Sequence, residues 1–172
     1  MLGTRGLLAD IAHREAARHA EGDEHQAGQA IERYLAVFRT ALNQNGATTK
    51  YSDLAVGFHW CGAFVYYCCL EAGFRLTPKP MEGARYTLAV VSSWQQWAMA
   101  GGYYLAGDQA PAQRGDIALY NGVYDGRPLD HLGVVIGVVS DGILSAEGNN
   151  ANRTGVFHRP FSVIDGYVRL PE

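Results

Sequence analysis

One stretch of sequence decides the fold: residues 60–73 read WCGAFVYYCCLEAG. It is the strongest apolar segment of the chain, and its pattern predicts a helix over Cys61–Ala72. Gly73 follows as the residue at which that helix ends. Because the turn-like residues 57–60 come just before it, we expect Cys61 at the N-terminus of the helix and not inside it.

Helical patterns lie before this stretch and strand patterns lie after it. Apolar residues at helical spacing predict helices within residues 7–12 and 27–42, and Ser92–Ala98 predicts a short one. Later, β-branched and aromatic runs bounded by turn residues predict short strands. These runs are Ile117–Tyr120, Leu132–Val139, Ile143–Ala146 and Tyr167–Leu170. The pair Asp141-Gly142 predicts a tight hairpin between the two middle strands.

Helices followed by strands imply an α+β fold in which N-terminal helices pack on one side of an antiparallel β-sheet. The sequence shows no repeat, low-complexity tract or linker, so we expect a single domain over residues 1–172. Within it we expect a helical lead-in over residues 1–45, the cysteine-bearing helix within residues 58–75, and the β-sheet over residues 103–172.

Composition and charge exclude several classes of protein. The chain has 172 residues, of which 48% are hydrophobic and 18% charged, and its net charge is −3. Without a basic surface we expect no nucleic-acid partner. No apolar run approaches the roughly 20 residues that span a bilayer, and residues 1–20 lack the apolar core of a signal peptide. We therefore expect synthesis in the cytoplasm, with any export or injection by a route that needs no signal.

The cysteines argue against a disulfide framework or a zinc site. The chain has three, Cys61, Cys68 and Cys69, and an odd count is untypical of a disulfide scaffold. In a helix, Cys61 and Cys68 would lie about 10 Å apart along the axis, beyond disulfide reach. No second Cys or His pair appears at ligand spacing. We expect no metal and no cofactor, and we interpret Cys68 and Cys69 as buried apolar residues.

A cysteine at a helix N-terminus is suited to nucleophilic chemistry. The helix dipole and the free N–H groups of the first turn favour the thiolate of Cys61. The same N–H groups would stabilise an oxyanion formed when an amide carbonyl is attacked. We assign Trp60 and Gly62, which flank the sulfur, to the substrate and oxyanion side of the site, since Gly62 leaves space there. The alternative is that Cys61 is a small buried hydrophobe.

Downstream polar residues complete a candidate constellation. His131 opens a predicted strand, where it would take the thiol proton and return it to a leaving amine. Glu147 ends the strand across the predicted hairpin, near the level of His131, and would orient the imidazole. Asn149 would share that task or bind substrate. Two other interpretations stay open: His59 competes as the base, and Glu147 to Asn150 are also typical of a simple turn.

Four segments resemble motifs of the CHAP family, the cysteine, histidine-dependent amidohydrolases/peptidases. They are Trp60–Val65, Arg114–Ala118, Asp130–Val135 and Ser145–Asn149, in the family's order. The resemblance implies a papain-like α+β fold, with Cys61 as nucleophile, His131 as base, Glu147 as the orienting group and Asn149 as a further polar residue. The related NlpC/P60 family usually has a serine after the nucleophile and a second histidine as the third residue. Gly62 and Glu147 therefore favour CHAP.

Many relatives cleave amide bonds of bacterial peptidoglycan, so the resemblance implies a cysteine amidase or peptidase acting on peptidoglycan peptides. The bond would join glycan to stem peptide, as for an N-acetylmuramoyl-L-alanine amidase, or lie within the stem peptides and cross-links. The lack of a recognisable signal fits a phage lysin, or a toxin injected into rival bacteria with a cognate immunity protein as partner. Two alternatives are an intracellular amidase acting on a polyamine or protein conjugate, and an inactive binding module.

Some CHAP relatives bind calcium through acidic residues just upstream of the nucleophile. In this sequence that region offers only Asp53, so the resemblance does not extend to a calcium site.

Overall fold

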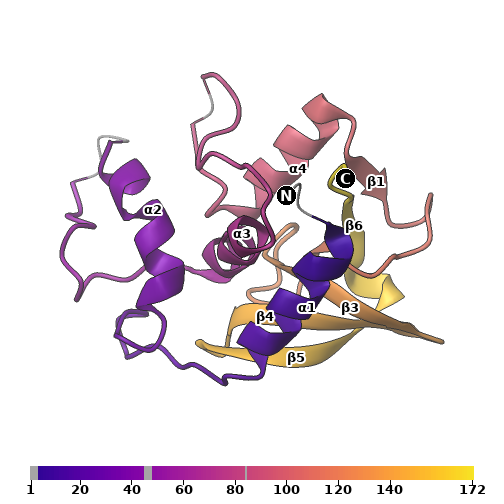
Figure 1. The fold of residues 1–172 in the computed structure, drawn as a ribbon, viewed down its shortest axis with the longest axis horizontal. Helices are drawn as coiled ribbons and strands as arrows, with labels where there is room; N and C mark the ends of the chain where they lie inside the picture. The colour runs from indigo at the N-terminus through magenta and orange to yellow at the C-terminus, as the bar shows by residue number, and fades with distance from the viewer. Residues whose placement is uncertain (1–3, 45–47, 84) are drawn as a thin grey trace.

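The computed structural model describes residues 4–44, 48–83 and 85–172. Within these residues, four α-helices come first and six strands follow (Figure 1). The elements are α1 (Arg5–Ala16), α2 (Glu32–Gln44), α3 (Cys61–Glu71), α4 (Val91–Gly101), β1 (Tyr104–Ala106), β2 (Ile117–Tyr120), β3 (His131–Val139), β4 (Gly142–Asn150), β5 (Arg153–Pro160), the 3-10 turn η1 (Phe161–Val163) and β6 (Ile164–Val168). Residues 1–3 and 45 of the predicted helical lead-in lie outside the described residues.

The strands form one sheet in the order β1-β6-β2-β3-β4-β5, and each neighbouring pair is antiparallel. In the ribbon view α1 crosses the strands, and both α1 and α3 pack on β3 and β4, while α4 packs on β1 and β6 (Figure 1). The main core lies between these helices and alternate side chains of the strands, such as Leu132 and Val134. The predicted α+β class, with helices on one side of an antiparallel sheet, is confirmed.

The helix α3 lies at the centre of the helical layer, in contact with α1, α2 and the sheet. For this reason it is apolar all round, and most of its residues are buried. It ends at Glu71, with Ala72 as its C-cap, and Gly73 adopts a φ of +89° that glycine tolerates at little steric cost. The expectation of a helix that begins at Cys61 and stops at Gly73 is confirmed.

The hairpin between β3 and β4 is present, but its turn lies one residue earlier than predicted. Val139 pairs with Gly142, so Ser140 and Asp141 form the turn and Gly142 is the first residue of β4. Gly142 lies in the strand because the neighbouring strand passes very close to it. A Cβ on Gly142 would lie 2.2 Å from the carbonyl oxygen of Arg159.

The sheet is also larger than the strand patterns indicated. β4 continues to Asn150, so the interpretation of residues 147–150 as a simple turn is wrong. The reason is β5, which pairs with β4 along its length and was not predicted as a separate strand. Its sequence, RTGVFHRP, contains glycine, proline and charged residues and few β-branched ones, which is untypical of a strand.

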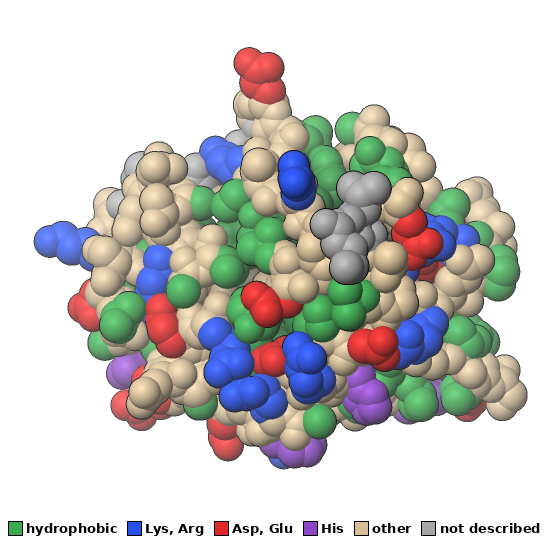
Figure 2. Space-filling model, viewed as in Figure 1, with side chains coloured by type: hydrophobic (Ala, Val, Ile, Leu, Met, Phe, Trp, Pro, Cys, Tyr) green, Lys and Arg blue, Asp and Glu red, His purple; other side chains and the backbone are tan. Residues whose placement is uncertain are grey.

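Charges of both signs are interspersed on the face seen in Figure 2. On α1, the buried carboxylate of Glu15 lies 3.6–3.9 Å from guanidinium groups of Arg14, Arg18 and Arg33. Positive charge around Glu15 is therefore partly compensated. Among the described residues, no helix has the length and apolar character needed to cross a membrane.

Candidate active site

Cys61 is the first residue of α3 and only 6% exposed, yet it lines a cavity. The residue before it, Trp60, is the N-cap and makes no side-chain capping bond. Backbone N–H groups in the first turn of a helix lack intrahelical acceptors. The sulfur therefore lies at the positive end of a helix dipole, beside N–H groups that are free to stabilise negative charge.

His131 and Glu147 form a buried pair across the hairpin. His131 is the first residue of β3, Glu147 lies in β4, and their exposed fractions are 1% and 0%. The imidazole Nε2 lies 2.9 Å from the Glu147 carboxylate Oε2. A hydrogen bond from Nε2 to a carboxylate leaves Nδ1 as the nitrogen available to a reacting group.

The thiol of Cys61 is one of the groups that interact with the His131 ring. Since Nε2 is bound to Glu147, Nδ1 is the ring nitrogen left for the thiol. Buried Nδ1 has no hydrogen-bond partner among the described residues. Hydrogen bonds between catalytic groups are often long before substrate binds.

Burial and neighbouring charged groups shift the pKa of His131 in opposite directions. Burial lowers its pKa, but the interactions with the Cys61 thiol and the Glu147 carboxylate outweigh burial and raise the pKa to about 10. The imidazole is therefore held as an imidazolium near neutral pH. A positively charged imidazolium beside a thiol favours the thiolate.

The carboxylate of Glu147 has further hydrogen-bond partners besides His131. Arg159 of β5 donates from Nε to Oε1 at 2.8 Å and from Nη2 to Oε2 at 2.5 Å, and Asn150 donates to Oε2 at 3.2 Å. Burial raises the pKa of Glu147, but the hydrogen bonds from Arg159 and His131 hold it below its ordinary value. Glu147 is thus an ionised carboxylate with both oxygens occupied. Sequence reasoning missed Arg159 because β5 was not predicted.

Two tyrosine rings lie nearly parallel to the imidazole of His131. Tyr120, its partner in the β2–β3 ladder, is 6.1 Å away between ring centroids and inclined by 28°. Tyr124 is 6.2 Å away and inclined by 12°. The ring of Tyr124 also meets the ring of His59 edge to face at 5.4 Å. These contacts restrict rotation of the imidazole out of the plane that faces Glu147.

The loop that carries Tyr124 is anchored by Asp130, the residue before His131. Its carboxylate accepts hydrogen bonds from the backbone N–H groups of Val123, Tyr124, Asp125 and Gly126 at 2.9–3.1 Å. Burial raises the pKa of Asp130, but these four donors outweigh it and lower the pKa below its ordinary value. The loop is therefore a stable wall of the site, closed by a carboxylate that stays ionised.

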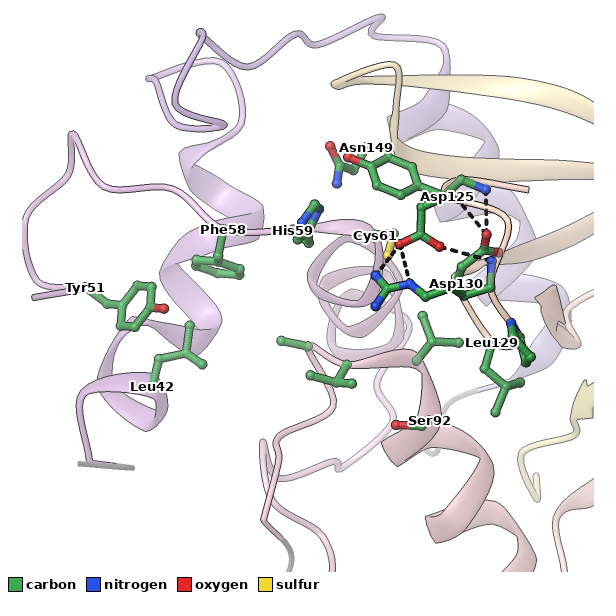
Figure 3. Close-up of a pocket in the computed structure, with 16 residues that line it drawn as sticks. Leu42, Tyr51, Phe58, His59, Cys61, Ser92, Asp125, Leu129, Asp130 and Asn149 are labelled. Carbon is green, nitrogen blue, oxygen red and sulfur yellow. Dashed lines mark hydrogen bonds and ion pairs between the residues drawn. The ribbon is translucent and has the colours of Figure 1, made fainter. Parts of the chain in front are cut away.

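A cavity of about 490 Å³ runs past the sulfur of Cys61. Figure 3 shows Leu42, Tyr51 and Phe58 on one side of Cys61 and Leu129 and Asp130 on the other, with Ser92 below. The described residues that line it are Leu42, Tyr51, Phe58, His59, Cys61, Ala89, Val90, Val91, Ser92, Tyr124, Asp125, Arg127, Pro128, Leu129, Asp130 and Asn149. The cavity therefore extends in two directions from the sulfur.

Asn149 and His59, the other polar residues expected at the site, both line the cavity but have different surroundings. Asn149 lines the cavity, is 1% exposed and has a φ of +60°, and its side-chain Oδ1 has no hydrogen-bond partner in the described chain. His59 also lines the cavity but lies against Tyr124. The structure thus brings Cys61, His131, Glu147 and Asn149 together in one place.

Trp60 and Gly62, expected on the substrate side, are both buried beside the sulfur and outside the cavity lining. Trp60 stacks on Tyr34 and donates from its indole to Asn152. A Cβ on Gly62 would lie 2.5 Å from the carbonyl oxygen of Ala89. Side-chain space at Gly62 is therefore filled by backbone, so the expectation that Gly62 leaves space beside the sulfur is wrong.

The described residues offer no metal site. Within residues 4–44, 48–83 and 85–172, no group of three or more His, Cys, Asp or Glu side chains is arranged to hold a metal ion. Asp53, the single acidic residue between residues 33 and 60, accepts a hydrogen bond from the N–H of Ala55 instead.

Two solved structures of Ly7917 resemble this chain in fold. One, described as the structure with the hydrolyzing product of MDP, has 15% sequence identity and a TM-score of 0.42, and the match covers 98% of this chain and 63% of that one. The other has 17% identity and a TM-score of 0.40, and the match covers 96% of this chain and 61% of that one. This chain thus spans about three fifths of the length of those proteins.

A comparison with curated proteins gave no match. The family model of the CHAP domain matches residues 53–149, a span that includes Cys61, His131, Glu147 and Asn149. That span is more than half of the chain, and the chain therefore belongs to the CHAP family.

Proposed function

We propose that this protein is a cysteine amidohydrolase or peptidase that hydrolyses amide bonds of bacterial peptidoglycan. One observation carries the proposal: His131 is bound through Nε2 to Glu147 and interacts with the Cys61 thiol, which lies at a helix N-terminus in a cavity. This is the relation of nucleophile, base and orienting group that amide hydrolysis by a thiol requires.

The first half of the reaction forms a thioester. The Cys61 thiolate attacks the amide carbonyl carbon, and the electron pair of the C=O bond moves to oxygen. The N–H groups of the first turn of α3 stabilise that oxyanion. As the oxyanion collapses, the C–N bond breaks, and the His131 imidazolium gives its proton to the departing amine.

The second half restores the enzyme. Neutral His131 takes a proton from water, whose oxygen attacks the thioester carbonyl carbon. The second oxyanion collapses, the C–S bond breaks, and the sulfur leaves as the thiolate beside the imidazolium. Glu147 keeps the imidazole in one orientation through both halves. Asn149, whose buried Oδ1 is unpaired in the described chain, accepts a hydrogen bond from the bound substrate.

The shape of the cavity supports a peptide substrate. It extends from Cys61 toward the apolar side chains of Leu42 and Phe58 and, on the other side, toward Leu129 and Asp130 (Figure 3). An extended peptide has residues on both sides of the scissile bond, so it would occupy both arms. Family membership adds peptidoglycan as the source of that peptide, since many CHAP relatives act on it.

Digestion of purified cell-wall sacculi tests the proposal. Mass spectrometry of the soluble products would reveal new amino termini at the sugar-linked alanine for an amidase, or new ends within stem peptides and cross-links for an endopeptidase. The Cys61→Ala variant is the control. Sacculi that release no new amine or carboxyl ends, while the wild-type Cys61 thiol reacts rapidly with iodoacetamide, would exclude the wall substrate.

A further inference from the structure

We propose that Arg159 is a positioning residue for the catalytic site: it holds Glu147 ionised and aims its carboxylate at His131. The inference rests on the proposed roles of Cys61, His131 and Glu147. Arg159 lies in β5, beyond residues 53–149 that the family model matches. It is therefore a feature that membership of the family does not by itself supply.

The geometry of the contact is that of a bidentate clamp. Arg159 Nε and Nη2 reach one carboxylate oxygen of Glu147 each, at 2.8 and 2.5 Å. Parallel N–H···O bonds from a planar guanidinium constrain both the position and the plane of a carboxylate. Because Oε2 also meets the His131 Nε2 at 2.9 Å, the plane that Arg159 selects is the plane in which the imidazole is held.

The β4–β5 register explains how Arg159 reaches Glu147. Arg159 pairs with Ile143, while Glu147 pairs with Gly155. The two side chains therefore extend toward each other along β4, from positions four residues apart, and meet at the carboxylate. The side chain of Arg159 passes over two aromatic rings, at 5.3 Å from the centroid of Phe157 and 5.6 Å from that of Tyr120. These stacking contacts hold a long side chain in one conformation.

Burial makes the charge of Arg159 necessary. Glu147 is 0% exposed, and a buried carboxylate without a cation tends to protonate. Burial indeed raises the pKa of Glu147, and the hydrogen bonds from Arg159 are the largest of the effects that lower it, ahead of those from His131. A protonated Glu147 would no longer stabilise the His131 imidazolium, and the Cys61 thiolate would lose its partner.

The test compares the pH dependence of Cys61 alkylation by iodoacetamide in the wild type and in Arg159→Met, with the modified site mapped by mass spectrometry. Loss of an adjacent arginine raises a carboxyl pKa by about 1–3 units. We expect the acid limb of the alkylation profile to move to higher pH by a similar amount. We also expect kcat on sacculi to fall about 100-fold with little change in KM.

A matched control lies next to the sheet, where Asp116 comes just before β2 and Arg169 just after β6. Arg169 makes the same bidentate contact with a buried carboxylate, from Nε and Nη2 to Asp116 at 2.9 and 2.7 Å. Arg169→Met removes a comparable clamp that does not touch the cavity, so its alkylation profile should match the wild type. Arg159→Lys keeps the positive charge but lacks the two parallel N–H donors, the fork, of the guanidinium. We therefore expect a near-normal acid limb of the alkylation profile and a lowered kcat.

Each outcome has a separate meaning. An acid limb in Arg159→Met that matches the wild type would overturn the inference and leave the proposed function standing. A wild-type Cys61 that reacts no faster than an ordinary thiol would refute the proposed function itself. If Arg159→Met does not fold, Arg159→Lys decides, because a wild-type kcat in that variant would show that the fork has no positioning role.

Discussion

Gly133 faces Glu147 across the β3–β4 ladder so closely that a Cβ on Gly133 would lie 2.6 Å from the Glu147 Cγ and 2.2 Å from the Ser145 Oγ. The register that pairs Val134 with Ala146 produces this approach. Gly133 comes two residues after His131, on the same face of β3. The glycine therefore makes room for the carboxylate that binds the imidazole.

Gly133→Ala should lower both stability and activity, since the added methyl group would push Glu147 away from His131. We expect a loss of about 1–3 kcal/mol in the free energy of unfolding and a fall in kcat of about 100-fold. Urea unfolding and sacculus digestion would measure the two effects. The control is Gly137→Ala in the same strand, where a Cβ would be 3.7 Å from its nearest neighbour, Leu144. Equal losses in both variants would contradict this account.

Local patterns were enough to predict the helices and the fold class. α3 was found because its apolar run and the following Gly73 depend only on neighbouring residues. β5 was missed because its residues form a strand through pairing with β4, and not through their own propensity. The one-residue error in the hairpin turn has a similar origin, since the close approach of Arg159 keeps Gly142 in the ladder.

The candidate site could be predicted only as far as its motifs reach. The structure brings Cys61, His131 and Glu147 together, as their order and the hairpin suggested, and their catalytic roles stay predictions. The groups around them come from contacts that local sequence does not encode. Arg159 depends on the β4–β5 register, and Tyr124 on a loop that Asp130 folds through its bonds to backbone N–H groups.

Cysteine labelling should distinguish Cys61 from its two neighbours. Burial raises the pKa of Cys68, with smaller contributions from Cys69 and Glu15, and burial alone raises the pKa of Cys69. Both thiols are fully buried, whereas Cys61 lines the cavity. We expect iodoacetamide to modify only Cys61 in the folded protein and all three cysteines in urea. Mass spectrometry would count the labels, and modification of folded Cys68 or Cys69 would argue against this structure.

Substitution of the proposed nucleophile, Cys61, should lower kcat more than substitution of the orienting carboxylate, Glu147. Cys61→Ser should reduce kcat by about 10⁴-fold or more, because the residues of a triad act as a unit. Glu147→Gln should cost less, about 100-fold, since nucleophile and base are retained and only orientation and charge are altered. Initial rates on sacculi would measure both. Similar and small losses in the two variants would refute the assigned roles.

The raised pKa of His131 gives stability a defined pH dependence. Its ordinary value is 6.5 and its value in the folded protein is about 10, so the folded state binds the proton more tightly. The resulting stabilisation is complete below pH 6.5 and is lost as pH rises toward about 10. Glu147 acts in the opposite direction: its lowered pKa gives stabilisation that is present above about pH 4.5 and lost as pH falls.

We therefore expect the free energy of unfolding, measured in urea, to decline between pH 6.5 and about 10 in the wild type. In His131→Asn this decline should be smaller. Over the same range kcat/KM should fall as the imidazolium loses its proton. An unchanged pH slope in His131→Asn would show that His131 is not the group that titrates.

Arg39 organises the wall of the cavity that contains Tyr51. Its Nη1 donates to the backbone carbonyls of Tyr51, Asp53 and Val56 at 2.8, 3.1 and 2.9 Å. Its Nε and Nη2 bind the carboxylate of Glu32 at 2.7 and 2.6 Å. One buried guanidinium thus holds a loop of which Tyr51 lines the cavity.

Arg39→Met should therefore loosen this wall without touching the reacting groups. Carbonyls left without a donor cost about 1–3 kcal/mol, and we expect KM for wall peptides to rise about tenfold because ordering the loop would oppose binding. Alkylation of Cys61 by iodoacetamide should be unchanged, since so small a reagent does not need the wall. Arg114→Met, which removes an exposed ion pair with Asp10, is the control. If Arg39→Met slowed alkylation as much as it weakened peptide binding, the loop would be part of the reacting centre and not only of the wall.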